Sequence, residues 1–181
     1  SQALFSDLVL LTNEDTLLRE IETIDITETP DVAGFTSSKA LMLSTAMVFK
    51  NNQKALIPFI DSLMEVDIAG LCIKTSRFLD TIDDEVIAHA NQRQFPIIDV
   101  PANMTLGVLS HNMYDYILEK QTKNMLETLD IQKHYSNLVI DGASPQQILD
   151  ELSDMIQAPV ILVNPFMRDI GHSSYFNKSF N

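Results

Sequence analysis

The residues best suited to bind a small molecule in this chain follow directly after short apolar runs. They are three hydroxyl side chains, two cations and one carboxylate: Ser44, Thr45, Thr75, Lys74, Arg77 and Asp99. The planar guanidinium of Arg77 offers a fork of donors, and Lys74 adds a point charge. This set predicts a site for an anionic or carbonyl-rich metabolite. The alternative interpretation is that Lys74 and Arg77 pair with surface acids, because the chain has 25 acidic residues.

Residue patterns that would indicate catalysis, a metal or a cofactor are missing from the sequence. The four histidines are far apart and show no His-x-x-x-His spacing. The five glycines never cluster into a phosphate-binding loop, and no Gly-x-Ser-x-Gly elbow occurs. We therefore expect a protein that is not an enzyme and holds neither a metal nor a cofactor.

The charge of the chain argues against binding to nucleic acid by these residues. The formal net charge is −13, and the 12 lysines and arginines are scattered along the sequence. Duplex DNA repels such a surface unless basic residues gather locally. We expect any contact with DNA to come from another part of the protein.

Features that bear on location favour the cytoplasm. The single cysteine, Cys72, lies in the apolar run Gly70–Ile73 and is expected to be a small buried hydrophobic residue. No apolar run approaches the roughly 18 residues of a membrane span, and the first residues do not resemble a signal peptide. We expect a cytoplasmic protein that does not contact the membrane.

The elements that would position the candidate site form an alternating pattern. Short runs rich in aliphatic and β-branched residues predict strands over 8–11, 21–27, 41–45, 69–74 and 96–101. Helical spacing of apolar residues predicts helices over 52–66 and 83–93, with Pro58 tolerated only at a kink or near the helix start. The pattern predicts an α/β fold with a mainly parallel sheet and flanking helices. Ligands bind beyond the carboxyl ends of such strands, where the six candidate residues follow.

Beyond Pro101 the pattern changes to helix. Residues 105–129 predict one long helix, or two helices broken near Glu119–Lys123, with an apolar stripe at Leu106, Leu109, Met113, Ile117, Met125 and Leu129. Such a helix is typical of a linker or a homodimer contact, and the alternative is that it simply packs against the sheet. Ser144-Pro145 then predicts a helix start, and 159–163 predicts a strand. We therefore expect three segments: a sensory domain at 1–103, a linker or dimerisation helix at 104–133, and the truncated start of a second α/β domain at 134–181.

Several consecutive stretches resemble the N-terminal domain of PucR-like (purine-catabolism regulator) proteins. Ile24–Asp31 is similar to the strand and acidic-Pro-Asp turn of that family. Ala40–Ala46 resembles its leucine-rich strand ending in Thr-Thr-Gly, with Ser44 and Ala46 as departures. Ala69–Lys74 resembles its glycine, aliphatic, Ile-Lys strand, with the basic Arg77 just beyond. Ala90-Asn91 and Phe95–Pro101 complete the resemblance, which covers a little over half of the chain.

The resemblance implies a bacterial transcription regulator with a helix-turn-helix at its far C-terminus, absent from these residues. It also implies a middle domain related to GAF or cyclase-like folds, whose opening we expect within 137–166. Ligand sensing through a small-molecule effector and dimerisation are the expected roles of this chain. Two alternatives stay open: a purely structural dimerisation module without a ligand, and a receiver-like phosphotransfer domain. A receiver needs an acidic pair directly after its first strand, whereas Glu14 and Asp15 fall in a turn.

Overall fold

The computed structural model describes residues 5–31, 34 and 36–175. The chain divides into two compact units, residues 1–121 and 122–181. Helix α4 (Leu106–Ile140) contributes residues to both units, and each unit is described by itself below.

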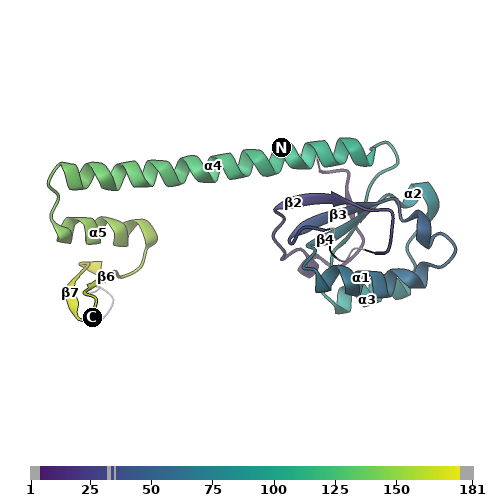
Figure 1. The fold of residues 1–181 in the computed structure, drawn as a ribbon, viewed down its shortest axis with the longest axis horizontal. Helices are drawn as coiled ribbons and strands as arrows, with labels where there is room; N and C mark the ends of the chain where they lie inside the picture. Colours follow the sequence, from purple (N-terminus) through teal and green to yellow (C-terminus); the bar gives the residue numbers. More distant parts are fainter. Residues whose placement is uncertain (1–4, 32–33, 35, 176–181) are drawn as a thin grey trace. The chain divides into compact units, whose positions relative to one another are not determined.

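The first unit is built on a five-stranded sheet (Figure 1). Its order is β1-β5-β4-β3-β2. The strands are β1 (Val9–Leu10), β2 (Thr23–Ile26), β3 (Ala40–Ser44), β4 (Gly70–Ile73) and β5 (Ile97–Asp99). Strands β2 to β5 pair in parallel, and β1 pairs antiparallel with β5 at one edge. The mainly parallel α/β fold that the sequence predicts is therefore confirmed.

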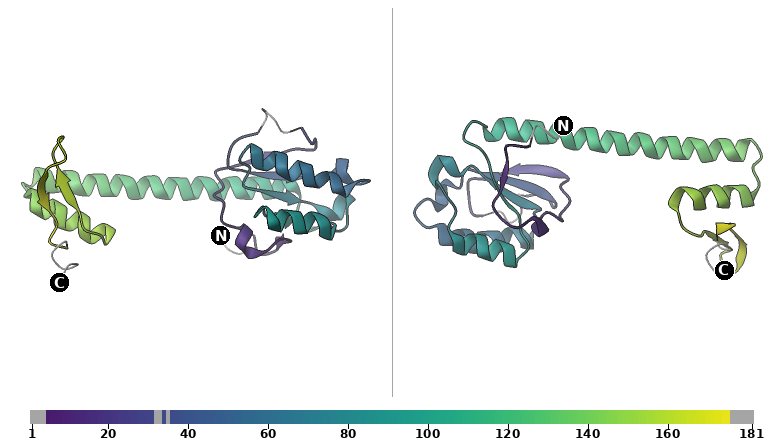
Figure 2. Two further views of the ribbon diagram at one scale, coloured as in Figure 1. Left: turned by 90° about the horizontal axis from the view of Figure 1, so that it is seen from below. Right: turned by 180° about the vertical axis from the view of Figure 1, so that it is seen from behind.

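Helices α1 (Leu56–Glu65) and α3 (Asp84–Gln92) lie on one face of this sheet (Figures 1 and 2). The short helix α2 (Thr75–Phe78) follows β4, and single 3₁₀ turns occur at Glu14–Thr16, Met47–Phe49 and Gln53–Ala55. Pro58 lies in the first turn of α1, where its missing N–H leaves no helical hydrogen bond unmade. The sequence predicted that Pro58 is tolerated only at a kink or near a helix start, and α1 does start close to it.

The side chains of the central strands alternate between two apolar clusters. Met42, Leu71 and Ile73 pack with α1 and α3, whereas Leu41, Leu43 and Cys72 face the first turns of α4. Because both faces of the parallel strands are covered, β3 and β4 are buried along their whole length, and all their residues except Ser44 are apolar or glycine. The sheet is thereby buried on both sides at its centre.

The first part of the apolar stripe predicted for this helix, from Leu106 to Ile117, lies in this core. Leu109 and Ile117 are buried against the sheet, with Leu106 and Met113 partly buried beside them. For these four residues the structure therefore agrees with the alternative in which the helix packs against the sheet. Periodicity alone identifies an apolar face but not what covers it.

Helix α4 is continuous over 35 residues, so the alternative of two helices broken near Glu119–Lys123 is wrong. In the second unit α4 is followed by α5 (Pro145–Ile156), β6 (Ile161–Val163) and β7 (Asp169–His172). Ser144 caps α5 as predicted, in a reciprocal pair of hydrogen bonds with Gln147. The antiparallel partner β7 was not predicted, because its sequence Asp-Ile-Gly-His lacks the run of β-branched residues typical of strands.

Among the described residues, no helix combines the length and apolar character needed to cross a lipid bilayer.

Candidate functional site

Five of the six predicted site residues lie at neighbouring strand ends of the first unit. Ser44 on β3 pairs in register with Ile73 on β4, and Ile73 pairs with Asp99 on β5. Thr45 directly follows the last residue of β3, and Lys74 directly follows the last residue of β4. The parallel arrangement therefore brings Ser44, Thr45, Lys74, Thr75 and Asp99 to one edge of the sheet, which we call the strand-end cluster.

Thr75 and Asp99 join two of these strand ends directly. Oδ1 of Asp99 accepts a hydrogen bond from the main-chain N–H of Thr75 at 3.1 Å and another from its hydroxyl at 2.8 Å. Thr75 is buried, whereas Asp99 is half-buried. The carboxylate thus connects the end of β5 to the residue that begins α2.

The ammonium of Lys74 is directed to main-chain carbonyls. It donates to Pro101 O at 3.2 Å, to Ala102 O at 2.9 Å, and also to Met104 O. These three oxygens belong to the connection between β5 and α4. The alternative, in which Lys74 pairs with a surface acid, finds no support among the ion pairs of the described residues.

Thr45 binds a carboxylate that the sequence analysis did not include in the site. The N–H of Thr45 donates to Oε1 of Glu28 at 2.9 Å, and its hydroxyl donates to Oε2 at 2.5 Å. Glu28 comes just after β2, the neighbour of β3, so the strand-end rule applied to β2 would have found it. Its place beside Pro30 favoured an interpretation as a turn residue instead.

The side chains of Ser44 and Arg77, the other two predicted site residues, make contacts of a different kind. The buried hydroxyl of Ser44 accepts a hydrogen bond from the N–H of Ala46 at 2.9 Å, which supports the left-handed backbone of Ala46 (φ 54°). Glycine is favoured at such a position, which explains why the related motif ends in glycine. Arg77 is exposed, and its guanidinium carbon lies 5.7 Å from the centroid of the Phe78 ring.

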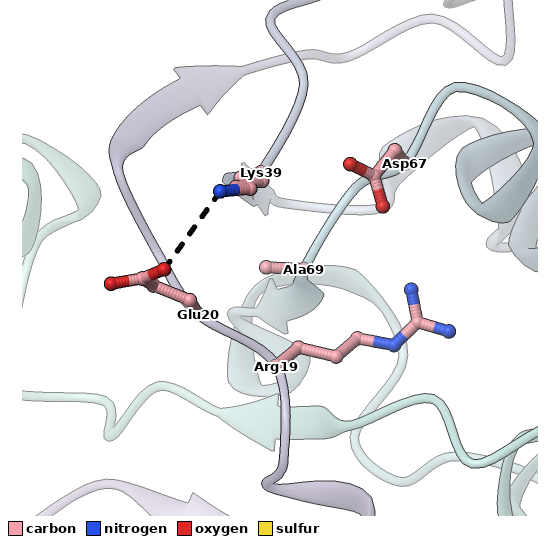
Figure 3. Close-up of a pocket in the computed structure, with 5 residues that line it drawn as sticks. All are labelled: Arg19, Glu20, Lys39, Asp67 and Ala69. Carbon is pink, nitrogen blue, oxygen red and sulfur yellow. Dashed lines mark ion pairs between the residues drawn. The ribbon is translucent and has the colours of Figure 1, made fainter. Parts of the chain in front are cut away.

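A small pocket lies at the opposite, amino ends of the strands (Figure 3). Its volume is about 140 Å³, and it is lined by Arg19, Glu20, Lys39, Asp67 and Ala69. The polar groups around it already have protein partners: Lys39 pairs with Glu22 at 2.5 Å, and Asp67 accepts from Ser38 at 2.7 Å. The hydrogen bond that the Lys39 ammonium donates to Glu22 also raises the pKa of Lys39. Typical ligand pockets enclose ~300 Å³ or more, so this pocket is small for a metabolite.

A larger open groove of about 600 Å³ lies within the second unit. Its lining includes the carboxylates of Asp141, Asp150, Glu151 and Asp154. Glu151 is bound to His134 at 2.6 Å, and Asp150 accepts the N–H of Ser174 at 2.5 Å. An acidic lining repels an anionic ligand, so this groove does not suit the metabolite class predicted for the strand-end cluster. No group of three or more metal-ligating side chains occurs within the described residues.

Comparison with known proteins relates the sheet to a family of regulators. The model of the purine catabolism regulatory protein-like family matches residues 1–117, which include all five strands and the first turns of α4. The chain is also similar to the purine catabolism regulatory protein of Bacillus subtilis (strain 168), with 30% identity over 146 residues. This match covers 81% of the chain but only 28% of the relative, so the chain spans well under half of the relative's length. No solved structure matches the chain.

Proposed function

Because the chain belongs to the purine catabolism regulatory protein-like family, we propose that it is the ligand-sensing and dimerising part of a bacterial transcription regulator. The family is described by a regulatory role, and a non-catalytic function agrees with that description. We propose a cytoplasmic location for the whole protein. The name of the Bacillus subtilis relative supports a role in purine breakdown, without identifying the effector.

The observation that carries the sensing proposal is the position of the strand-end cluster beside the connection into α4. Thr45, Thr75 and Asp99 hold this edge in a defined arrangement through their own hydrogen bonds, at the position where ligands of open α/β sheets bind. Arg77 is exposed next to this edge and offers donors to an anionic or carbonyl-rich metabolite. A ligand that binds one arrangement of this edge better than another would shift the population of α4 arrangements.

A thermal-shift screen tests the sensing proposal. The chain is screened against purines, ureides, amino acids and small carboxylates, and a bound ligand raises the melting temperature. We expect a hit whose shift is lost in Arg77→Ala. Lys39→Ala serves as the control, because it removes a cation at the amino ends of the strands. A blank across the library, or a hit unaffected by Arg77→Ala, would argue against sensing at this edge and favour the purely structural dimerisation module.

The dimerisation proposal rests on the exposed stretch of α4. All residues from 118 to 134 are exposed in the described structure, a length of about 25 Å at the rise of an α-helix. Isolated helices of this length are only marginally stable in water, and helices in proteins are stabilised mainly by packing. The exposed stretch therefore lacks its main source of stability. Met125, Leu129 and Val139 are each at least half exposed and follow the 4-3 spacing of a coiled-coil seam, together with Gln132 and Ser136. We call these five residues the α4 stripe.

A second copy of the chain is the partner that we propose for the α4 stripe. The stripe lies away from the residues of α4 that meet α5, since His134 bonds to Glu151 and Leu138 is half-buried. Its polar members, Gln132 and Ser136, would set the register of the two helices in the way that single polar residues do in coiled coils. Their presence also predicts a seam of modest strength.

Light scattering after size exclusion tests the dimer. Met125→Lys combined with Leu129→Lys should convert a dimer into a monomer, because two charges would face their copies across the seam. Glu127→Gln with Asp130→Asn is the matched control, because removing two negative charges on the opposite side of the helix changes the net charge by the same +2. A mass unchanged by the first pair, or changed equally by both pairs, would contradict this seam.

DNA recognition is proposed to lie outside this chain. The net charge of −13 and the scattered basic residues support this. A gel-shift assay of the chain with duplex DNA should show no binding at moderate salt. Tight binding would contradict the charge argument.

The second unit is proposed to open a further α/β domain, as the division at 134–181 predicts. Each side chain of β6, Ile161, Leu162 and Val163, is at least 41% exposed, although an all-apolar strand is typical of a sheet covered on both faces. We expect the amides of 161–163 to exchange with solvent more slowly in the longer protein than in this chain. Equal exchange rates would contradict a domain completed by additional polypeptide.

A further inference from the structure

Lys74 has no ammonium donor left for a ligand. An ammonium carries three N–H donors, and three main-chain oxygens, those of Pro101, Ala102 and Met104, accept from this one. Bonds from a charged donor are shorter and stronger than bonds between neutral groups. The side chain is thus an internal cation bound by carbonyls, although its position at a strand end suggested a ligand contact.

The main chain of Lys74 is held in place independently of its ammonium. Its N–H donates to Ser44 O on β3 at 3.1 Å. The next residue, Thr75, is bound twice to Asp99 of β5. Two neighbouring strands therefore fix the backbone of Lys74. From this fixed position its side chain extends to the connection from Val100 to Thr105.

The connection from Val100 to Thr105 leads directly into the long helix α4. Met104 N–H donates to Pro101 O at 3.0 Å, and Pro101 has no N–H to donate. The hydroxyl of Thr105 then accepts from the N–H of Val108 at 3.2 Å and caps α4. The Lys74 ammonium contacts the carbonyls of three of the four residues before this cap.

We propose that Lys74 is a positioning residue that fixes the start of α4 on the sheet. A displacement of the strand ends of β4 and β5 is passed through its ammonium to the first turns of α4. This deepens the proposed function by giving the sensing edge a physical connection to α4. We call the hydrogen bonds from the Lys74 ammonium to Pro101, Ala102 and Met104 the clamp, and these bonds do not depend on whether a ligand binds.

Amide hydrogen exchange in Lys74→Met tests the proposal. Methionine keeps the length of the apolar stem but removes the charge and all three donors. We expect exchange of residues 102–112 to accelerate by about tenfold or more, while residues 84–92 of α3 stay unchanged. Lys54→Met is the control, since Lys54 is an exposed lysine paired with Glu85 at 2.8 Å, and it should leave residues 102–112 unchanged.

Two outcomes would overturn the clamp. One is unchanged exchange at 102–112 in Lys74→Met. The other is equal acceleration at 84–92, because a residue that serves only global stability loosens both segments together. Neither outcome bears on the thermal-shift screen, so failure of the clamp and failure of ligand sensing are distinguishable.

If Lys74→Met does not fold, the wild-type chain answers the question by nitrogen-detected NMR of the lysine ammonium groups. Protons held by three carbonyls exchange slowly with water, so the Lys74 ammonium should give a resolved signal where that of the exposed Lys54 is broadened. A Lys74 signal broadened like that of Lys54 would overturn the clamp.

Discussion

The carboxylate of Asp99 receives two hydrogen bonds from Thr75, one from the N–H at 3.1 Å and one from the hydroxyl at 2.8 Å. Both bonds end on the same oxygen, Oδ1, so the ends of β4 and β5 are joined by one side chain. A buried hydroxyl bound to a carboxylate is worth more than a neutral pair, because the acceptor is charged. This relationship determines what a substitution at either residue should do.

Replacing the hydroxyl of Thr75 is expected to weaken this junction. Thr75→Val keeps the shape of the side chain but removes the donor, which should lower the free energy of unfolding by about 1–2 kcal/mol. Urea denaturation followed by circular dichroism measures the change. Thr81→Val is the control, since Thr81 is exposed and should change stability little. Equal stability of Thr75→Val and wild type would show that the bond contributes nothing net.

The close approach of β4 to the residue before β5 predicts that Gly70 does not tolerate a side chain. A Cβ added at Gly70 would lie 2.7 Å from Cγ of Pro96 and 3.3 Å from its carbonyl oxygen. We expect Gly70→Ala to reduce stability by about 1–3 kcal/mol, as overpacking does in cores.

Gly107 provides the matched control for that change. It lies in the first turn of α4, and an added Cβ meets nothing nearer than Thr105 Oγ1 at 4.0 Å. Gly107→Ala should be neutral or stabilising by up to about 1 kcal/mol, because alanine favours helix. Thermal unfolding compares the two variants, and a harmless Gly70→Ala would contradict the steric argument.

The end of α3 predicts opposite effects for one substitution at two nearby positions. Gln94 has a left-handed backbone (φ 51°), and Phe95 N–H reaches back to Ala90 O at 2.9 Å in a helix-ending turn. Glycine adopts this backbone without strain, so Gln94→Gly should stabilise the chain by about 0.5–1 kcal/mol.

Gln92 is the comparison, because it is the last helical residue of α3. Gln92→Gly should destabilise the chain by a similar amount, since glycine is a poor helix former. Chemical denaturation of both variants gives the two signs. If both variants shift stability in the same direction, the backbone explanation is wrong.

Burial predicts an unreactive thiol at Cys72. Desolvation raises the pKa of this thiol from its ordinary value of 9.0 to about 12. A disulfide reagent at pH 8 should therefore label Cys72 only after the chain unfolds. Labelling of the native chain at the rate of the unfolded chain would contradict the burial of this strand.

The same shift has a consequence for stability in alkali. Between pH 9 and pH 12 the unfolded chain loses the thiol proton while the folded chain keeps it. The contribution of the Cys72 thiol to the free energy of unfolding is thus fully present below pH 9. It falls as the pH rises, by at most about 1.4 kcal/mol per pH unit. Comparison of wild type with Cys72→Ala across this range isolates the effect, and parallel stability curves would contradict it.

Local patterns in the sequence predicted most of the first unit. The apolar runs around Leu41 and Leu71 are rich in aliphatic residues and too short for helices, so strand was the state that their side chains favour. Pro58 and Ser144 mark helix starts because their effects act on the nearest turn of backbone. Such signals depend on neighbours a few residues away, and a sequence displays those neighbours directly.

The tertiary structure alone decided which partner each site residue takes. The sequence shows that Lys74 ends a strand, but only the fold brings its ammonium to carbonyls almost thirty residues later, and only the fold places Glu28 on Thr45. The same holds for α4, where Leu109 and Met125 share a helix but only Leu109 meets the sheet. Helical and strand periods are set by short-range geometry, whereas contacts between distant residues depend on how the elements pack, and one sequence pattern is compatible with several packings.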